Sequence, residues 1–108
     1  MFSGGAKSFS IYPLRVVYIY TEKKETASAA ILTSVSKKRF KRAVKRNRVK
    51  RQIREAYRKN KFILLDLLEP KEYGLAIAFI YQATTEFASA EIEEKMKIAL
   101  ARIGEKLE

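Results

Sequence analysis

The chain has 108 residues, 47% of them apolar, and a formal net charge of +11. This length allows one compact domain, residues 1–108, and the apolar fraction can form a core, so a disordered basic tail is excluded. The absence of cysteine and histidine excludes disulfides, the usual zinc sites and histidine-activated nucleophiles. With no long apolar run and no signal-like N-terminus, we expect a cytoplasmic protein that makes no membrane contact.

Two strands are predicted first. Residues 12–20 are rich in β-branched and aromatic side chains, which favours a strand with Pro13 at its start or at a bulge. A polar connection leads to a second predicted strand, residues 28–35, and the two lie close enough in sequence to pair antiparallel.

A helix is predicted for residues 42–60, which contain neither glycine nor proline and are dominated by good helix formers. Val49, Ile53, Ala56 and Tyr57 recur at helical spacing and form one narrow apolar face. The apolar run 62–68 either extends this helix or begins a buried connection, and Pro70 ends whatever precedes it.

The C-terminal third predicts one strand and one helix. Residues 73–81 are almost entirely apolar, as expected for a strand covered on both faces. Residues 89–107 place apolar side chains at helical spacing behind an acidic first turn. The order of elements predicts a two-layer α/β sandwich with helices on one face of the sheet and the other face open. Chirality rules alone predict a right-handed crossover between strands 28–35 and 73–81 if they are parallel neighbours.

The positive charge is concentrated in residues 37–61. This segment carries 14 lysines and arginines against one acid, Glu55, while the remainder of the chain is slightly acidic. Such crowding of like charges costs stability, so a polyanionic partner is the simplest reason to keep it.

A stripe of basic residues follows one flank of the predicted helix. At about 100° per residue, Asn47, Lys50, Arg51, Arg54 and Arg58 share this flank, while Arg48 points elsewhere, beside Glu55. Planar guanidinium groups suit phosphates because each can donate two parallel hydrogen bonds. A solvated helix face would normally mix charge signs, and a membrane-surface helix would need a longer apolar face.

RNA is favoured over DNA by the open sheet face and by tyrosines that could stack on unpaired bases. Tyr12, Tyr18 and Tyr20 are the candidates, although for any one of them an ordinary core aromatic is the favoured interpretation. The acids are scattered, with Asp66 the only aspartate, so we expect neither catalytic residues nor metal ligands in the polypeptide.

The segment from 36 to 58, SKKRFKRAVKRNRVKRQIREAYR, resembles the signature of the bacterial ribonuclease P protein subunit. That signature has Ser-Lys-Lys at the end of a strand and then a helix carrying R-N-R-x-K-R-x-x-R-E-x-[FY]-R. The matching positions are Ser36, Lys37, Lys38, Arg46, Asn47, Arg48, Lys50, Arg51, Arg54, Glu55, Tyr57 and Arg58.

The resemblance implies a mixed sheet of about four strands, a fold similar to a ribosomal-protein domain, and an unusual left-handed crossover. It also implies a protein cofactor of a catalytic RNA, which uses Mg²⁺ to cut the 5′ leader from precursor tRNA, while the polypeptide alone is not catalytic. The protein would act as a monomer bound 1:1 to that RNA. The residues implied to bind RNA are Ser36, Lys37, Lys38, Arg46, Asn47, Arg48, Lys50, Arg51, Arg54 and Arg58, and those implied to contact the leader are Phe2, Val16 and Tyr18.

The N-terminus departs from the family pattern. Family members begin with a helix of about 20 residues that bears two phenylalanines, and here only its end is expected, with Phe2 matching the second of them. The alternative from another class is a ribosomal or general RNA-binding α/β protein with no role in tRNA processing.

Overall fold

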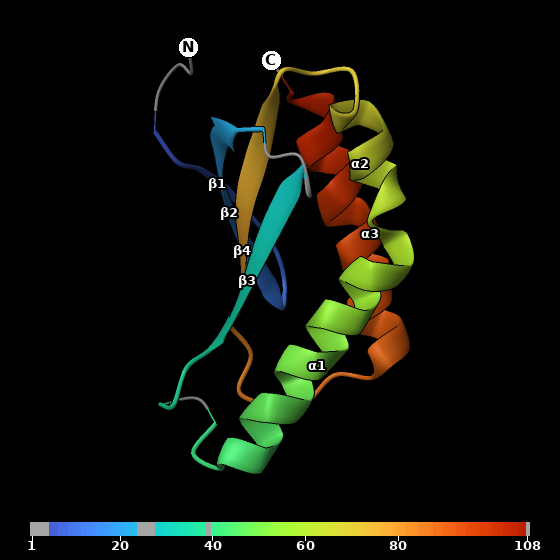
Figure 1. Cartoon of the computed structure of the whole chain (residues 1–108). Helices are drawn as coiled ribbons and strands as arrows, with labels where there is room; N and C mark the ends of the chain where they lie inside the picture. The colour runs from blue at the N-terminus through green and yellow to red at the C-terminus, as the bar shows by residue number, and fades with distance from the viewer. Residues whose placement is uncertain (1–4, 24–27, 39, 108) are drawn as a thin grey trace.

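The computed structural model describes residues 5–23, 28–38 and 40–107. They form a four-stranded sheet in the order β1-β2-β4-β3, with three helices on one of its faces (Figure 1). The α/β class, the sheet of about four strands and the single helical layer are therefore confirmed. No helix among the described residues is long and apolar enough to cross a membrane. The elements are β1 (Lys7–Ile11), β2 (Leu14–Glu22), β3 (Ala29–Val35), α1 (Ala43–Asn60), α2 (Phe62–Leu68), β4 (Tyr73–Tyr81) and α3 (Ser89–Glu105).

Strand β1 was not predicted. It pairs antiparallel with the first half of β2, and the chain turns between them at Tyr12 and Pro13, whose peptide bond is cis. Pro13 thus precedes the strand, where its missing N–H disturbs no ladder. The sequence KSFSI is short and half polar, so this edge strand has no strong signal of its own and depends on β2 for pairing.

The predicted antiparallel pairing of residues 12–20 with 28–35 is wrong. Strand β4 lies between them and pairs antiparallel with β2 and parallel with β3. A central position suits β4 because it is the most apolar of the four strands. On its helix-facing side, the residues from Leu75 to Tyr81 are buried, whereas Ala76 and Ala78 on the other side are only half-buried, so the predicted cover on both faces is also wrong.

The crossover from β3 through α1 and α2 to β4 is left-handed. In Figure 1, β3 lies nearest the viewer with β4 behind it, the helices lie to the right, both strands run downward and α1 runs upward. The family resemblance therefore gave the correct hand, and the general rule for parallel neighbours gave the wrong one.

The hydrophobic core lies between the sheet and the helices. Alternate residues of β2 and β4 point into it and meet Val49, Ile53 and Ala56 of α1. Helix α3 adds Ile92, Met96, Leu100 and Ile103 to this layer, as its spacing predicted.

The run 62–68 forms a separate short helix, α2, after a one-residue turn at Lys61. Its C-terminal end is tied to the sheet by Lys23, whose Nζ donates to the carbonyl oxygens of Leu68, Glu69 and Lys71 at 3.2, 2.5 and 2.9 Å. A cation at this end satisfies carbonyl groups that the helix leaves without partners.

Candidate nucleic-acid interface

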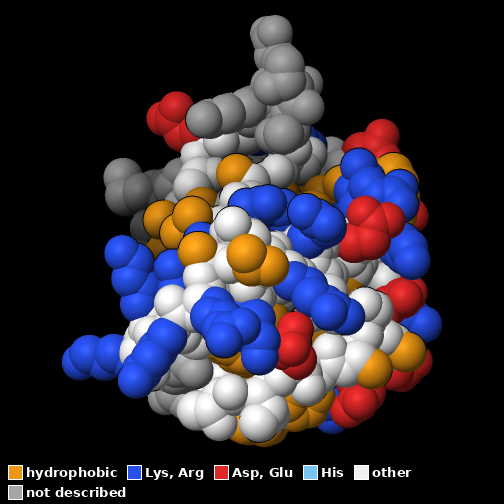
Figure 2. Space-filling view, turned by 90° about the horizontal axis from the view of Figure 1, so that it is seen from below, with side chains coloured by type: hydrophobic (Ala, Val, Ile, Leu, Met, Phe, Trp, Pro, Cys, Tyr) orange, Lys and Arg blue, Asp and Glu red, His pale blue; other side chains and the backbone are white. Residues whose placement is uncertain are grey.

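Helix α1 presents the predicted basic stripe to solvent. Burial of Val49, Ile53 and Ala56 against the sheet fixes the rotation of the helix about its axis. The opposite flank then exposes Asn47, Arg51, Arg54 and Arg58, with Lys50 half-buried beside them. Figure 2, seen from the end where α1 begins, shows Lys and Arg side chains gathered on this end of the molecule with few acids among them.

The first turn of α1 adds to the positive potential. Its N-cap residue, Arg42, makes no side-chain capping bond, and no acid lies in the first turn. By contrast, α3 has Glu91 in its first turn. The N-terminal N–H groups and the positive end of the α1 dipole are therefore not neutralised by an acid of that turn, which favours an anion.

Ser36 organises the turn that follows β3. Its hydroxyl accepts a hydrogen bond from the Lys38 N–H at 3.1 Å, and its carbonyl accepts one from the Phe40 N–H at 3.0 Å. Phe40 is buried against the ring of Tyr81, with 5.8 Å between ring centroids. This anchor leaves Lys37 and Lys38 exposed, so the chain adds two cations near the start of α1.

Arg46 holds the same loop in place. Its Nη1 donates to the carbonyl oxygens of Phe40 at 2.7 Å and Lys41 at 2.9 Å. This nitrogen therefore donates to two main-chain carbonyl oxygens, and the Arg46 side chain stabilises the loop before α1. The remaining guanidinium N–H groups are the ones that could reach a phosphate.

Arg48 and Arg58 both have acidic partners. The helical spacing places Arg48 beside Glu55, but its carboxylate partner is Glu86, in the loop after β4, with 3.7 Å between Arg48 Nε and Glu86 Oε1. Glu55 instead binds Arg58, three residues further along α1. Its hydrogen bond with Arg58 lowers the pKa of Glu55 and raises that of Arg58. The cations of the stripe without a carboxylate partner among the described residues are Lys50, Arg51 and Arg54.

Val16 and Tyr18 do not face the surface, which contradicts their expected contact with a leader strand. Val16 is 0% exposed and Tyr18 is 1% exposed, because the helices cover the face of β2 from which both point. Phe2, the third residue of that prediction, lies outside the described residues.

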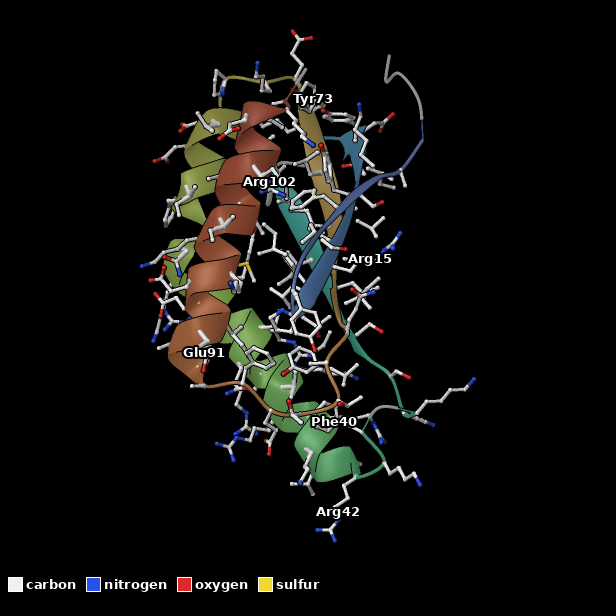
Figure 3. The ribbon with its side chains drawn as sticks, turned by 180° about the vertical axis from the view of Figure 1, so that it is seen from behind. Arg15, Phe40, Arg42, Tyr73, Glu91 and Arg102 are labelled. Carbon is white, nitrogen blue, oxygen red and sulfur yellow. The ribbon has the colours of Figure 1, made fainter. Side chains whose placement is uncertain are left out.

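The open face of the sheet carries a groove of about 280 Å³ instead. We call it the open-face groove, and its lining includes Val17, Ile19, Ala30, Leu32, Ala76 and Ala78. Figure 3 shows Arg15 pointing away from the helices on the same side of β2. The signal for these residues was present in the sequence, since alternation along β2 separates Arg15, Val17 and Ile19 from the buried set.

No group of three or more acidic side chains that could hold a metal ion occurs within the described ranges. The basic surface consists of lysines, arginines and the start of α1, and it lies on the two-layer sandwich. Its chemistry is the binding of anionic oxygens through charge-assisted hydrogen bonds.

These features define a class: a small two-layer α/β protein whose left-handed crossover helix forms a cationic binding surface. A family profile described as ribonuclease P matches residues 5–104. The chain belongs to the ribonuclease P protein family.

One relative supports this assignment by its sequence, and two solved structures share the fold. The ribonuclease P protein component of Porphyromonas gingivalis is 46% identical over 101 residues, which is 94% of this chain and 74% of that protein. The ribonuclease P protein of Thermotoga maritima has the same fold, with a TM-score of 0.68 and 24% identity over 90% of this chain and 83% of that one. The Staphylococcus aureus ribonuclease P protein gives a TM-score of 0.64 and 24% identity over 91% of this chain and 80% of that one.

Proposed function

We propose that this protein is the RNA-binding subunit of a ribonuclease P whose catalyst is RNA, and that it assists removal of the 5′ leader from precursor tRNA. The observation that carries the proposal is the exposed flank of α1, where Lys50, Arg51 and Arg54 lie together without carboxylate partners among the described residues. Each could neutralise a phosphate of the catalytic RNA and release condensed counterions.

The turn after β3 extends this surface. Lys37 and Lys38 stand next to the unneutralised start of α1, so a phosphate backbone lying along the helix can continue over the turn. Asn47 is exposed within the stripe, and its amide can accept a hydrogen bond as well as donate one, whereas lysine and arginine can only donate. Arg48 and Arg58 join the interface once an RNA phosphate replaces Glu86 or Glu55 as their partner.

The open-face groove supports a second part of the proposal, contact with the single-stranded leader. Its apolar lining suits unpaired bases, and Arg15 beside it can meet a backbone phosphate. This assignment replaces the buried pair Val16 and Tyr18. We further propose that the Mg²⁺ needed for cleavage is held by the RNA, that one protein binds one RNA, and that the complex works in the cytoplasm.

Reconstitution tests the proposal. The protein is added to a bacterial ribonuclease P RNA at low Mg²⁺, and cleavage of a precursor tRNA is measured with and without it. We expect faster cleavage with the protein and none by the protein alone. A general RNA-binding protein of the same fold would leave the cleavage rate unchanged.

A second comparison tests the leader contact. A chain extended by about 20 residues at its N-terminus, the length of helix that the family resemblance implies, is assayed beside this one with precursors of different leader length. Leader-dependent stimulation by both forms supports the open-face groove. Stimulation by the extended form alone would assign leader binding to the added segment.

A further inference from the structure

Two cations, Arg102 and Lys106, lie away from the basic stripe of α1, where the C-terminal end of α3 packs against β1. The guanidinium carbon of Arg102 is 5.3 Å from the centroid of the Phe9 ring, and Nζ of Lys106 is 5.6 Å from it. Figure 3 shows Arg102 on α3, on the side that faces β1. We call Phe9, Arg102 and Lys106 the β1–α3 corner.

The corner is held in place from two sides. The hydroxyl of Tyr20 donates to the carbonyl oxygen of Lys106 at 3.2 Å, which ties the last turn of α3 to the sheet. Phe9 is fixed by its pairing with Val16 and by an edge contact with the Tyr18 ring at 6.4 Å. The ring therefore orients both cations, and because a cation–π contact needs no hydrogen bond, it uses none of their N–H donors.

Neither cation has a carboxylate partner within residues 5–23, 28–38 and 40–107. Glu105, which lies between them in sequence, makes no ion pair with either. The two like charges gathered on the Phe9 ring repel each other. Such crowding is offset most simply by a bound polyanion.

Phosphates bound by the basic stripe of α1 cannot also contact the β1–α3 corner. Strand β1 is one edge of the sheet and β3 is the other, and α1 packs beside β3 whereas α3 reaches β1. The corner also lies on the helix-covered side of the sheet, because Phe9 pairs with the buried Val16, so it is separate from the open-face groove.

We propose that the β1–α3 corner is a second RNA-backbone site, at which Arg102 and Lys106 bind phosphates of an RNA segment other than the one docked on α1. This inference rests on the proposed function and deepens it, since the protein then bridges two RNA segments. The segment belongs either to the catalytic RNA or to the precursor tRNA, and the phosphate chemistry is the same in both.

The test is the salt dependence of two binding equilibria, measured with the complete chain: protein with catalytic RNA, and precursor tRNA with the reconstituted complex. The variant Arg102→Gln with Lys106→Gln should lower the log–log slope of one equilibrium by about 1.5, because each phosphate contact adds about 0.7 to 0.9. The equilibrium that changes identifies the source of the phosphates. The matched control is Lys95→Gln with Lys97→Gln, which removes two charges from α3 away from the corner and should leave both slopes unchanged.

Stability is measured beside binding, since the cation–π contacts also pack α3 on β1. Should the double variant unfold, Lys106→Gln alone keeps Arg102 over the ring and should still lower the slope by about 0.8. Arg102→Lys retains the charge and should retain the slope. Unchanged slopes in both equilibria, with a folded variant and a wild type that stimulates cleavage, would overturn the second site alone. A wild type that fails to stimulate cleavage would instead reject the proposed function.

Discussion

Arg58 and Glu55 form a bidentate ion pair on the exposed flank of α1. The Arg58 Nε lies 3.2 Å from each carboxylate oxygen of Glu55, and its Nη2 also contacts Oε1. Glu55 is the only acid within a segment of 14 lysines and arginines, and it engages the last arginine of the stripe. The free protein therefore presents a narrower cationic surface than its sequence suggests.

Replacing Glu55 with Gln should strengthen binding to the catalytic RNA. The amide carries no charge, so Arg58 becomes available to a phosphate and the log–log salt slope should rise by up to about 0.9. Binding is measured by titration at several salt concentrations. Glu94→Gln is the matched control, because it removes the partner of Lys97 on α3. Equal affinities and equal slopes for Glu55→Gln and wild type would mean that the ion pair with Glu55 does not limit the contact of Arg58 with RNA.

Replacing Arg51 and Arg54 together with Ala should weaken binding to the catalytic RNA and lower the salt slope by roughly 1.5 to 2. Both side chains are exposed, so the stability of the fold should change little. The same titration measures the effect, with thermal melting as a check on folding. Lys95→Ala with Lys97→Ala removes the same charge from α3 and should leave this equilibrium unchanged.

The two glycines in regular structure should respond differently to alanine. A Cβ at Gly74 would lie 2.7 Å from the main-chain carbonyl oxygen of Ser28, which accepts a hydrogen bond from the Leu75 N–H. Because this oxygen belongs to the β3 end of the ladder, Gly74→Ala should destabilise the protein by about 1 to 3 kcal/mol.

A Cβ at Gly104 would meet only Leu67 Cδ1, at 2.6 Å. Leu67 is largely exposed, so this methyl can rotate away, and alanine favours the helix by up to about 1 kcal/mol. Gly104→Ala should therefore change the free energy of unfolding by less than about 1 kcal/mol. Urea denaturation compares the two variants, and equal losses of stability would contradict the distinction.

The stability of the protein should fall at alkaline pH through Tyr81. This side chain is 1% exposed and its hydroxyl donates to the Thr85 carbonyl oxygen at 2.7 Å. Burial raises the pKa of Tyr81 from its ordinary value of 10.0 to about 12. The native state thus keeps the Tyr81 proton at a pH where the unfolded state has already lost it. Tyr81 therefore contributes fully to the stability of the fold below about pH 10, and this contribution is lost as the pH rises toward 12.

Tyr81→Phe removes both the hydrogen bond and the titrating group. At neutral pH the variant should lose about 1 kcal/mol. Above pH 10 its stability should fall less steeply than that of the wild type, as measured by urea denaturation at a series of pH values. Parallel alkaline curves for the two proteins would contradict the role of Tyr81.

Local pattern was enough to predict the element that carries the charge. Residues 42–60 were expected to be helical and α1 spans Ala43–Asn60, with the expected buried residues Val49, Ile53 and Ala56. The periodicity of a helix and the spacing of its arginines belong to one continuous segment, so both can be calculated without knowing what the segment packs against. The family signature lies in the same segment, which is why the family could be recognised from the sequence.

Contacts between segments that are distant in sequence determined which face of β2 is buried and where the edge strand β1 forms. Alternation along β2 separates Val16 and Tyr18 from Val17 and Ile19, but both sets are apolar, so only the position of the helices decides which set is buried. Strand β1 exists because β2 pairs with it.

The partners of the interface cations were likewise decided in three dimensions. Glu86 comes from a loop 38 residues after Arg48, and the carbonyl groups that Arg46 binds become available only when the turn before α1 is folded. The sequence by itself determined that a helix of this protein is cationic along one flank, because charge and helical period are local. Only the tertiary structure decided which of those cations pair with carboxylates and which face of the sheet is open, because both depend on long-range packing.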